Sequence, residues 1–524
     1  MKRATAAGRG VSPVVFMPFI RWGKSLTAKH KNQRQEGASY ALIVLSCINL
    51  LNFADRYVPS AVKSLLKKDL HLSDVQTSLP ATGMILVYMV AALFFGWIAD
   101  MRILDRRLIL AGGIASWSLV TALAGVSQSF GQLLVFRSLI GVGEAAYMTI
   151  VPPMIADFYP IADRNMAYLV FSLSAPLGGA LGFVAGSVLG PAWSWRVAFF
   201  VCGFPGILVS LLVLTLNDPS PGVNDPDDMR QGVQELQPHG DDDGGGLRKA
   251  ARKSALGDVR DIVAVPHWIV SEIGMIACSF TVGAMADWYA TFLFRTVPGV
   301  TIGRAGLVVG ACTLLGGVGG SILGSQVAEV VKSRCRNAFL LVSGLFMVPS
   351  TVLIYLAVNW TVGQYLSYAL GLLSQLCFFT YLAPLNAVMT NCMPVHLRAR
   401  AGALSILLSH VLGDLISPPI VGAISDGTRS LRAGMQLCWA MSAVAGVAWI
   451  TGGLLLPPLP GSAGDADDAG PGGVAALPVK EPKAPQPSLL SLLSGEGEAE
   501  EEEEPPAALA KDPSGYGAAA SVQA

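Results

Sequence analysis

Residues 136–147 read Phe-Arg-Ser-Leu-Ile-Gly-Val-Gly-Glu-Ala-Ala-Tyr and place Arg137 and Glu144 inside an apolar segment that is long enough to span a membrane. Each such charge costs about 2.5 to 3.5 kcal/mol at the centre of a bilayer. The two residues are two helical turns apart, so they lie on one stripe of a helix. That stripe must face protein or water and not lipid.

The composition of the whole chain is that of a membrane protein. Of its 524 residues, 52% are hydrophobic and only 14% are charged, against about 25% charged in soluble domains. Apolar runs of about 20 residues predict membrane-spanning helices. We expect twelve of them, at 39–60, 78–99, 107–127, 130–156, 166–190, 196–216, 266–293, 303–328, 336–358, 362–390, 400–424 and 433–457. The sequence therefore predicts an all-α polytopic, multi-pass integral membrane protein.

The charges are distributed unevenly along the chain. The net charge is zero, so the overall balance indicates no nucleic-acid partner. Most Lys and Arg residues fall in the tails and in the loops on one side of the bilayer, which predicts that both termini are cytoplasmic. The main exception is Lys63, Lys67 and Lys68, which we place in the first outer loop.

An internal repeat divides the spans into two sets. Residues 160–164, Pro-Ile-Ala-Asp-Arg, are matched 234 positions later by residues 394–398, Pro-Val-His-Leu-Arg, and each motif precedes a span. We expect two pseudo-symmetric six-helix bundles. The predicted parts are a basic cytoplasmic tail (1–38), an N-terminal bundle (39–216), a cytoplasmic linker (217–264), a C-terminal bundle (265–457) and a disordered acidic cytoplasmic tail (458–524).

A second charged pair, Asp55 and Arg56, lies near the end of the first span. An interfacial position, with both side chains reaching into water, is one alternative. We favour burial, because the apolar run continues through residues 58–62. The repeat offset carries Arg137 to Gly371 and Glu144 to Phe378, so any coupling ion should bind mainly in the first half.

The second half has ionisable groups of its own. His410 and Asp414 are one helical turn apart and can share a face as a proton-titratable pair, with a purely structural histidine as the equal alternative. Glu272 and Asp287 are further acids in the span at 266–293. A carboxylate buried between helices changes its proton affinity when a guanidinium moves towards or away from it.

The loop after the second span contains Gly96, Asp100, Arg106 and Arg107. A basic, acid-containing loop can cap helix ends and form ion pairs that latch the cytoplasmic face. A plain positive anchor explains the arginines, but it explains Gly96 and Asp100 less well.

The chain lacks the motifs of several other classes. It has no phosphate-binding glycine loop with its lysine, no zinc-ligand spacing and no nucleophile triad, and its eight cysteines show no metal-like pattern. We expect no enzymatic activity, no cofactor and no metal. Two related bundles with buried charges are what alternating access requires.

Several motifs together resemble the Spinster family of the major facilitator superfamily. They are Asn52 to Arg56, Gly141 to Ala145, Pro176 to Gly186, and Ser409 to Asp414 with Ser417 and Pro418. The loop around Asp100 is similar to the superfamily signature, with extra residues before Arg106.

The resemblance implies a secondary transporter for amphipathic lipids, such as lysophospholipids or sphingoid bases and their phosphates, often proton-coupled. It implies the plasma membrane or the endolysosomal membrane. Asp55, Arg56, Arg137 and Glu144 would form the coupling and gating group, and His410 with Asp414 matches the second-half motif.

A lipid needs a cavity with a polar end and an apolar side. Candidates for its wall are Tyr88, Trp117, Tyr147, Tyr381 and Asn386, although aromatic residues in spans more often serve packing. We expect a monomer in the lipid bilayer. Two alternatives remain: a major facilitator for small organic anions or sugars, and a receptor or scaffold that transports nothing.

Overall fold

The computed structural model describes residues 34–101, 105–220, 223–224, 257–332, 334–335, 337–361, 363–394 and 397–458. Every helix described below belongs to one compact unit. Residues 1–33 of the predicted basic tail, most of the predicted linker and the acidic tail beyond 458 lie outside the described residues.

The prediction of twelve membrane-spanning helices is confirmed, because twelve described helices are long and apolar enough to cross a membrane. The first six are α2 (Ala38–Asp69), α3 (Asp74–Met101), α4 (Arg106–Ala124), α5 (Phe130–Phe158), α6 (Ile161–Ala192) and α7 (Trp195–Val213). The remaining elements are α10 (Pro266–Thr296), α11 (Ile302–Lys332), α12 (Ala338–Asn359), α13 (Gln364–Phe378), η2 (Phe379–Tyr381), α14 (Leu382–Asn391), α15 (Arg398–Ser409), η4 (His410–Asp414), α16 (Ser417–Thr428) and α17 (Leu431–Leu455).

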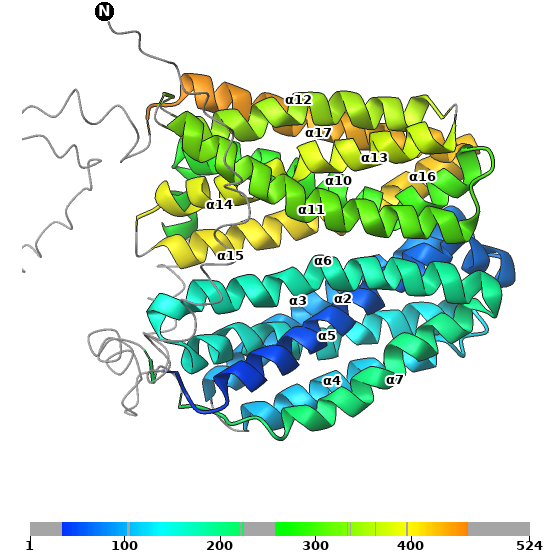
Figure 1. Ribbon diagram of the computed structural model, residues 1–524, viewed down its shortest axis with the longest axis horizontal. Coiled ribbons are helices and arrows are strands. Elements are labelled where there is room, and N and C mark those ends of the chain that lie inside the picture. The colour runs from blue at the N-terminus through cyan, green and yellow to red at the C-terminus, as the bar shows by residue number, and fades with distance from the viewer. Residues whose placement is uncertain are drawn as a thin grey trace, which may run out of the picture. The chain divides into compact units, whose positions relative to one another are not determined.

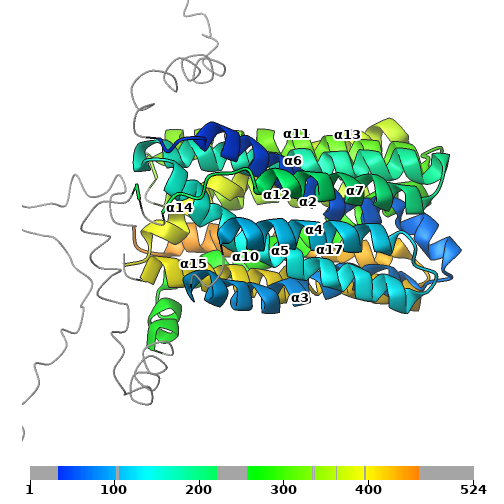
Figure 2. The same ribbon diagram turned by 90° about the horizontal axis from the view of Figure 1, so that it is seen from below.

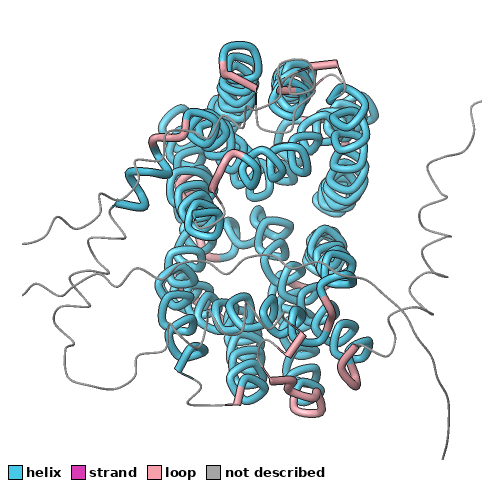
Figure 3. The backbone as a smooth tube through the Cα atoms, turned by 90° about the vertical axis from the view of Figure 1, so that its left-hand side faces the viewer, coloured by secondary structure: helices cyan, strands magenta, loops and turns pink. Residues whose placement is uncertain are grey.

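The helices are grouped in two bundles that lie side by side (Figure 1). Of the labelled elements, α2 to α7 make up one bundle and α10 to α17 the other. Seen along the helices, the described residues form two groups in which only helices and loops are drawn (Figure 3). The outer surface carries exposed apolar side chains, such as Leu93, Leu208 and Val447, which are at least 65% exposed. A surface of this kind is suited to contact with lipid tails.

The two repeated motifs have the same local structure. Arg164, at the start of α6, donates from Nε to the carbonyl oxygen of Tyr159, five residues earlier. Arg398, at the start of α15, donates in the same way to Met393, again five residues earlier. Equivalent arginines thus tie equivalent helix ends together in the two bundles.

Three spans differ from their prediction in ways that bear on the candidate site. The first is predicted to end at residue 60, but α2 continues to Asp69, so Lys63, Lys67 and Lys68 lie in the helix and not in a loop. The helix can continue because Lys63 finds a buried partner, described below. The tenth span is interrupted by the 3₁₀ turn η2, and the eleventh by the π-helical turn η4 between α15 and α16.

Helices of both bundles run nearly along one direction, as the view from below shows (Figure 2). We call the end at which α2 begins and α17 ends the tail end, at the left of Figure 1, and the opposite end the far end. In the far half, α6 packs on α11: a Cβ atom on Gly310 would lie 3.0 Å from the carbonyl oxygen of Ala180.

Candidate functional site

Glycines bring α5 close to its neighbours beside Glu144. A Cβ atom on Gly141 would lie 2.4 Å from the carbonyl oxygen of Met84 on α3, and one on Gly143 would lie 2.4 Å from the carbonyl oxygen of Gly113 on α4. Only glycine permits such close approach of helix backbones. Glu144 is fully buried as a result, and Arg137 on the same helix is 1% exposed.

Glu144 forms its ion pair with α2. The Nη2 and Nε atoms of Arg56 lie 2.6 and 3.0 Å from Oε2 of Glu144. The guanidinium also lies against the rings of Phe53 and Tyr88, 5.4 and 5.7 Å from their centroids. The side chain of Arg56 is 23% exposed, so this pair sits where the protein interior meets accessible space.

Arg137 reaches α2 at the neighbouring residue. Its Nη1 atom donates to the backbone oxygen of Asp55 at 3.2 Å, and Nη2 lies 3.7 Å from the sulfur of Met84. The carboxylate of Asp55 is 2% exposed and accepts a 3.5 Å hydrogen bond from Thr121 on α4. Although Arg137 and Glu144 share a stripe, Glu144 pairs with an arginine from a different helix.

The four predicted coupling residues are therefore close together where α2 meets α5. Two carboxylates and two guanidiniums balance in charge when all are ionised. Two of their oxygens, Oδ1 of Asp55 and Oε1 of Glu144, are buried without a hydrogen-bond partner among the described residues. A buried acceptor without a donor is costly, and a proton on the carboxyl group would let that group donate in turn.

His410 and Asp414 lie together in the second bundle. Nδ1 of His410 is 2.9 Å from Oδ1 and 3.0 Å from Oδ2 of Asp414. Both residues belong to the π-helical turn η4 and not to a regular α-helix. Such turns are frequent at functional sites, and His410 lines a cavity that is described below.

The predicted latch is only partly described. Gly96 lies within α3, and the side chain of Asp100 lies outside the described part of the chain. Arg106 forms ion pairs with Asp157 at the end of α5, at 2.6 Å, and with Asp218 after α7, at 2.5 Å. Arg107 pairs with Asp105, and the bond from Arg107 holds the pKa of the Asp105 carboxyl below its usual value. These contacts join elements of the N-terminal bundle.

The predicted cavity-wall residues have different surroundings. Trp117, Tyr147 and Tyr381 belong to hydrophobic cores, and Tyr147 donates to the carbonyl oxygen of Leu45. Tyr88 lies beside Arg56, whereas Asn386 lines a cavity. The first three are packed in hydrophobic cores in this structure, and their place in a cavity wall stays a prediction.

A buried ion pair that the sequence did not reveal joins the bundles near the far end. Lys63 on α2 pairs with Asp287 on α10, and both residues are almost fully buried. The ammonium of Lys63 lies 3.8 Å from the ring centroid of Trp288. Ser60 donates to the same carboxylate at 3.3 Å. The sequence pattern places Lys63 in a loop and gives no sign of a partner on another helix, so this pair is evident only in the structure.

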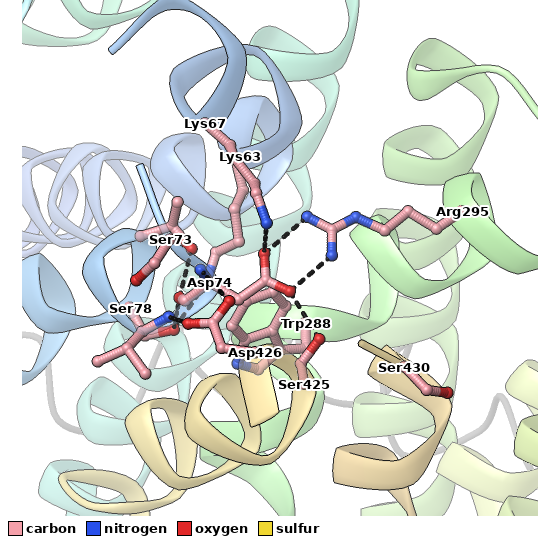
Figure 4. A network of polar contacts seen from close by, with 12 residues as sticks. Lys63, Lys67, Ser73, Asp74, Ser78, Trp288, Arg295, Ser425, Asp426 and Ser430 are labelled. Carbon is pink, nitrogen blue, oxygen red and sulfur yellow. Dashed lines mark hydrogen bonds and ion pairs between the residues drawn. The ribbon is translucent and has the colours of Figure 1, made fainter. Parts of the chain in front are cut away.

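Asp74, the first residue of α3, is the centre of a larger network (Figure 4). Its carboxylate accepts bonds from Lys67 on α2 at 2.6 Å, from Arg295 on α10 at 2.8 and 2.9 Å, and from Ser425 on α16 at 2.6 Å. Asp74 thus holds side chains of the C-terminal bundle to α3.

Asp426 on α16 caps α3 from the other bundle. Its two carboxylate oxygens accept the backbone N–H groups of Asp74 and Val75, each at 2.9 Å. The first N–H groups of a helix have no partner within that helix. We call the contacts of Lys63, Asp74, Asp287, Arg295 and Asp426 the far-end gate.

Comparison with known proteins agrees with this architecture. The Major Facilitator Superfamily profile matches residues 45–418. Protein spinster homolog 1 of Xenopus tropicalis is 31% identical over 432 residues, covering 77% of this chain and 78% of that protein. Protein spinster homolog 3 of Danio rerio is 31% identical over 424 residues, covering 77% and 80%.

A solved structure shares the fold. It is described as a bacterial homolog to the human lysosomal transporter Spinster, in an inward-facing and occupied conformation. It has a TM-score of 0.63 and 21% identity, over 80% of this chain and 95% of that chain.

Proposed function

The chain belongs to the Spinster family of the Major Facilitator Superfamily, and from this premise we propose that it is a proton-coupled secondary transporter of an amphipathic lipid. The lipid would be a lysophospholipid or a sphingoid base or its phosphate. The bundles would rock about a central site and open it to each side of the membrane in turn.

The observation that carries proton coupling is the buried set of Asp55, Arg56, Arg137 and Glu144. Two acids and two bases are balanced, so one added proton leaves a net positive charge in a desolvated place. Burial of an uncompensated charge is strongly unfavourable. Rearrangement of α2 against α5 would relieve that cost by letting a guanidinium move to water, and Arg56 is already partly exposed.

The far-end gate supports the gating half of the mechanism. It joins α2 and α3 of one bundle to α10 and α16 of the other. At the tail end, by contrast, Arg34 pairs with Asp163 of the N-terminal bundle, and Arg400 on α15 pairs with Asp258 of the segment before α10. If the tail end is cytoplasmic, as the Lys and Arg distribution predicts, this conformation is closed on the outside.

The apolar exterior supports residence in a bilayer as a multi-pass protein. We propose both termini in the cytoplasm, the plasma membrane or the endolysosomal membrane as the location, and a monomer as the working unit. Epitope tags at either terminus should be accessible to antibody only after the membrane is permeabilised.

The test is flux in proteoliposomes that contain the purified full-length chain. Radiolabelled lysophospholipids and sphingoid bases are offered with and without an imposed pH gradient, beside protein-free liposomes. We expect uptake of at least one lipid, stimulated by the gradient and abolished by a protonophore. Uptake of a soluble anion or sugar without lipid uptake would overturn the substrate, and the absence of any flux would favour a receptor.

A further inference from the structure

Glu272 on α10 is a buried acid of the C-terminal bundle, apart from the set on α2 and α5. It is 3% exposed. Oε2 of its carboxylate accepts a hydrogen bond from Ser405, and Oε1 accepts one from Ser409 at 3.2 Å. The two serines are one turn apart on α15, so they present both hydroxyls from one face of that helix.

Four of the other five buried acids in the described part of the chain form ion pairs, and the fifth, Asp55, has Arg137 bonded to its own backbone oxygen. Asp74, Asp157, Glu144 and Asp287 each form an ion pair with a lysine or an arginine. Among the described residues, Glu272 forms no ion pair, and its partners are hydroxyl groups. Two neutral donors do not compensate a full negative charge in a desolvated place. A mobile cation bound beside the carboxylate would compensate its charge.

The two serines open onto a cavity of about 320 Å³. Its wall also includes Trp268, Ser279 and Asn386. A volume of this size has room for about ten water molecules at roughly 30 Å³ each, so the cavity has space for water beside the two serines.

The other charged groups near the site are engaged elsewhere. Arg398 lines the cavity and donates to the carbonyl oxygen of Met393, and His410 lines it and is paired with Asp414. His267, at the start of α10, contacts the carbonyl oxygen of Pro457.

We propose that Glu272, Ser405 and Ser409 form a second cation-binding site, which takes a proton or Na⁺. Both occupants have the required chemistry, since each neutralises the carboxylate, and Na⁺ accepts hydroxyl and carboxylate oxygens as ligands. The site joins α10 to α15, so its occupancy changes how these two helices hold together. Its role in transport rests on the proposed function, but cation binding itself does not.

The experiment uses the purified full-length protein and measures binding without transport. Infrared difference spectra between acidic and alkaline buffers report the carbonyl band of protonated carboxyl groups. If the occupant is a proton, Glu272→Gln removes one component of that band. Thermal unfolding in NaCl against choline chloride, at alkaline pH, reports Na⁺. If the occupant is Na⁺, NaCl raises the unfolding midpoint of the parent but not that of Glu272→Gln.

Two further variants keep the result interpretable. Ser405→Ala with Ser409→Ala retains the carboxyl group, so it should move the pH midpoint of the band or abolish the Na⁺ response even if Glu272→Gln fails to fold. Asp258→Asn, which loses only a pair with Arg400, should match the parent. Equal spectra and equal Na⁺ responses in the parent and all Glu272, Ser405 and Ser409 variants would overturn the proposal. Failure of lipid flux alone would not affect it.

Discussion

Lys63 on α2 and Asp287 on α10 are 224 residues apart in sequence, and their side chains form a buried ion pair that joins the two bundles. Removing one partner leaves the other charge buried and uncompensated, which costs about 3 to 5 kcal/mol. Replacing both with apolar residues of similar volume is often neutral or stabilising.

We therefore expect Lys63→Met and Asp287→Leu each to lower the free energy of unfolding by about 3 to 5 kcal/mol, and the double variant to recover most of that loss. The measurement is a double-mutant cycle of unfolding in detergent. Asp69→Asn, which breaks a more exposed pair with Arg196 at the same end, should cost about 1 kcal/mol or less. Additive single effects would contradict a direct interaction.

Glu144→Gln should abolish uptake driven by a pH gradient while leaving substrate exchange largely intact. The amide still fills the space beside Arg56, but it cannot take up a proton at neutral pH. Counterflow and gradient-driven uptake are measured in the same proteoliposomes, with Asp69→Asn as the control. Retained gradient-driven uptake would remove Glu144 from the coupling mechanism.

Asp426→Ala should favour separation of the bundles at the far end. The substitution removes an acceptor of two backbone N–H groups on α3. Hydrogen bonds to charged groups contribute about 1.5 to 3 kcal/mol, and 1.4 kcal/mol is a factor of ten in population. We expect the far-end-open population to rise about tenfold or more.

The readout for Asp426→Ala is the distance distribution between spin labels at positions 68 and 365, one in each bundle. Both side chains are exposed. Asp69→Ala serves as the matched control, because its pair with Arg196 lies within the N-terminal bundle. An unchanged distribution in Asp426→Ala would mean that the cap does not hold the gate.

Gly182→Ala should destabilise the contact between α6 and α2. A Cβ atom there would lie 2.3 Å from the carbonyl oxygen of Ala54, next to Asp55. Relief requires movement of the backbone, which costs about 1 to 3 kcal/mol. Gly317→Ala is the control, because nothing lies within 4 Å of the added atom. The midpoint temperature of unfolding and the rate of gradient-driven uptake should both fall in Gly182→Ala. Both should remain near the values of the parent in Gly317→Ala.

Much of the architecture could be predicted from local patterns. A span needs only about 20 apolar residues in a row, and the repeated motifs before α6 and α15 were enough to predict two related bundles. Burial of Arg137 and Glu144 followed from the high cost of placing a charge in lipid. These properties depend on neighbours in sequence and on the solvent around each helix.

The tertiary structure alone decided which charges meet. Glu144 pairs with Arg56 and not with Arg137 on its own helix, Lys63 pairs with Asp287 of the other bundle, and the carboxylate of Glu272 meets two serine hydroxyls. Helical periodicity says which side chains share a stripe. It does not say which stripe of another helix faces them, because that is set by the close packing of all the helices at once.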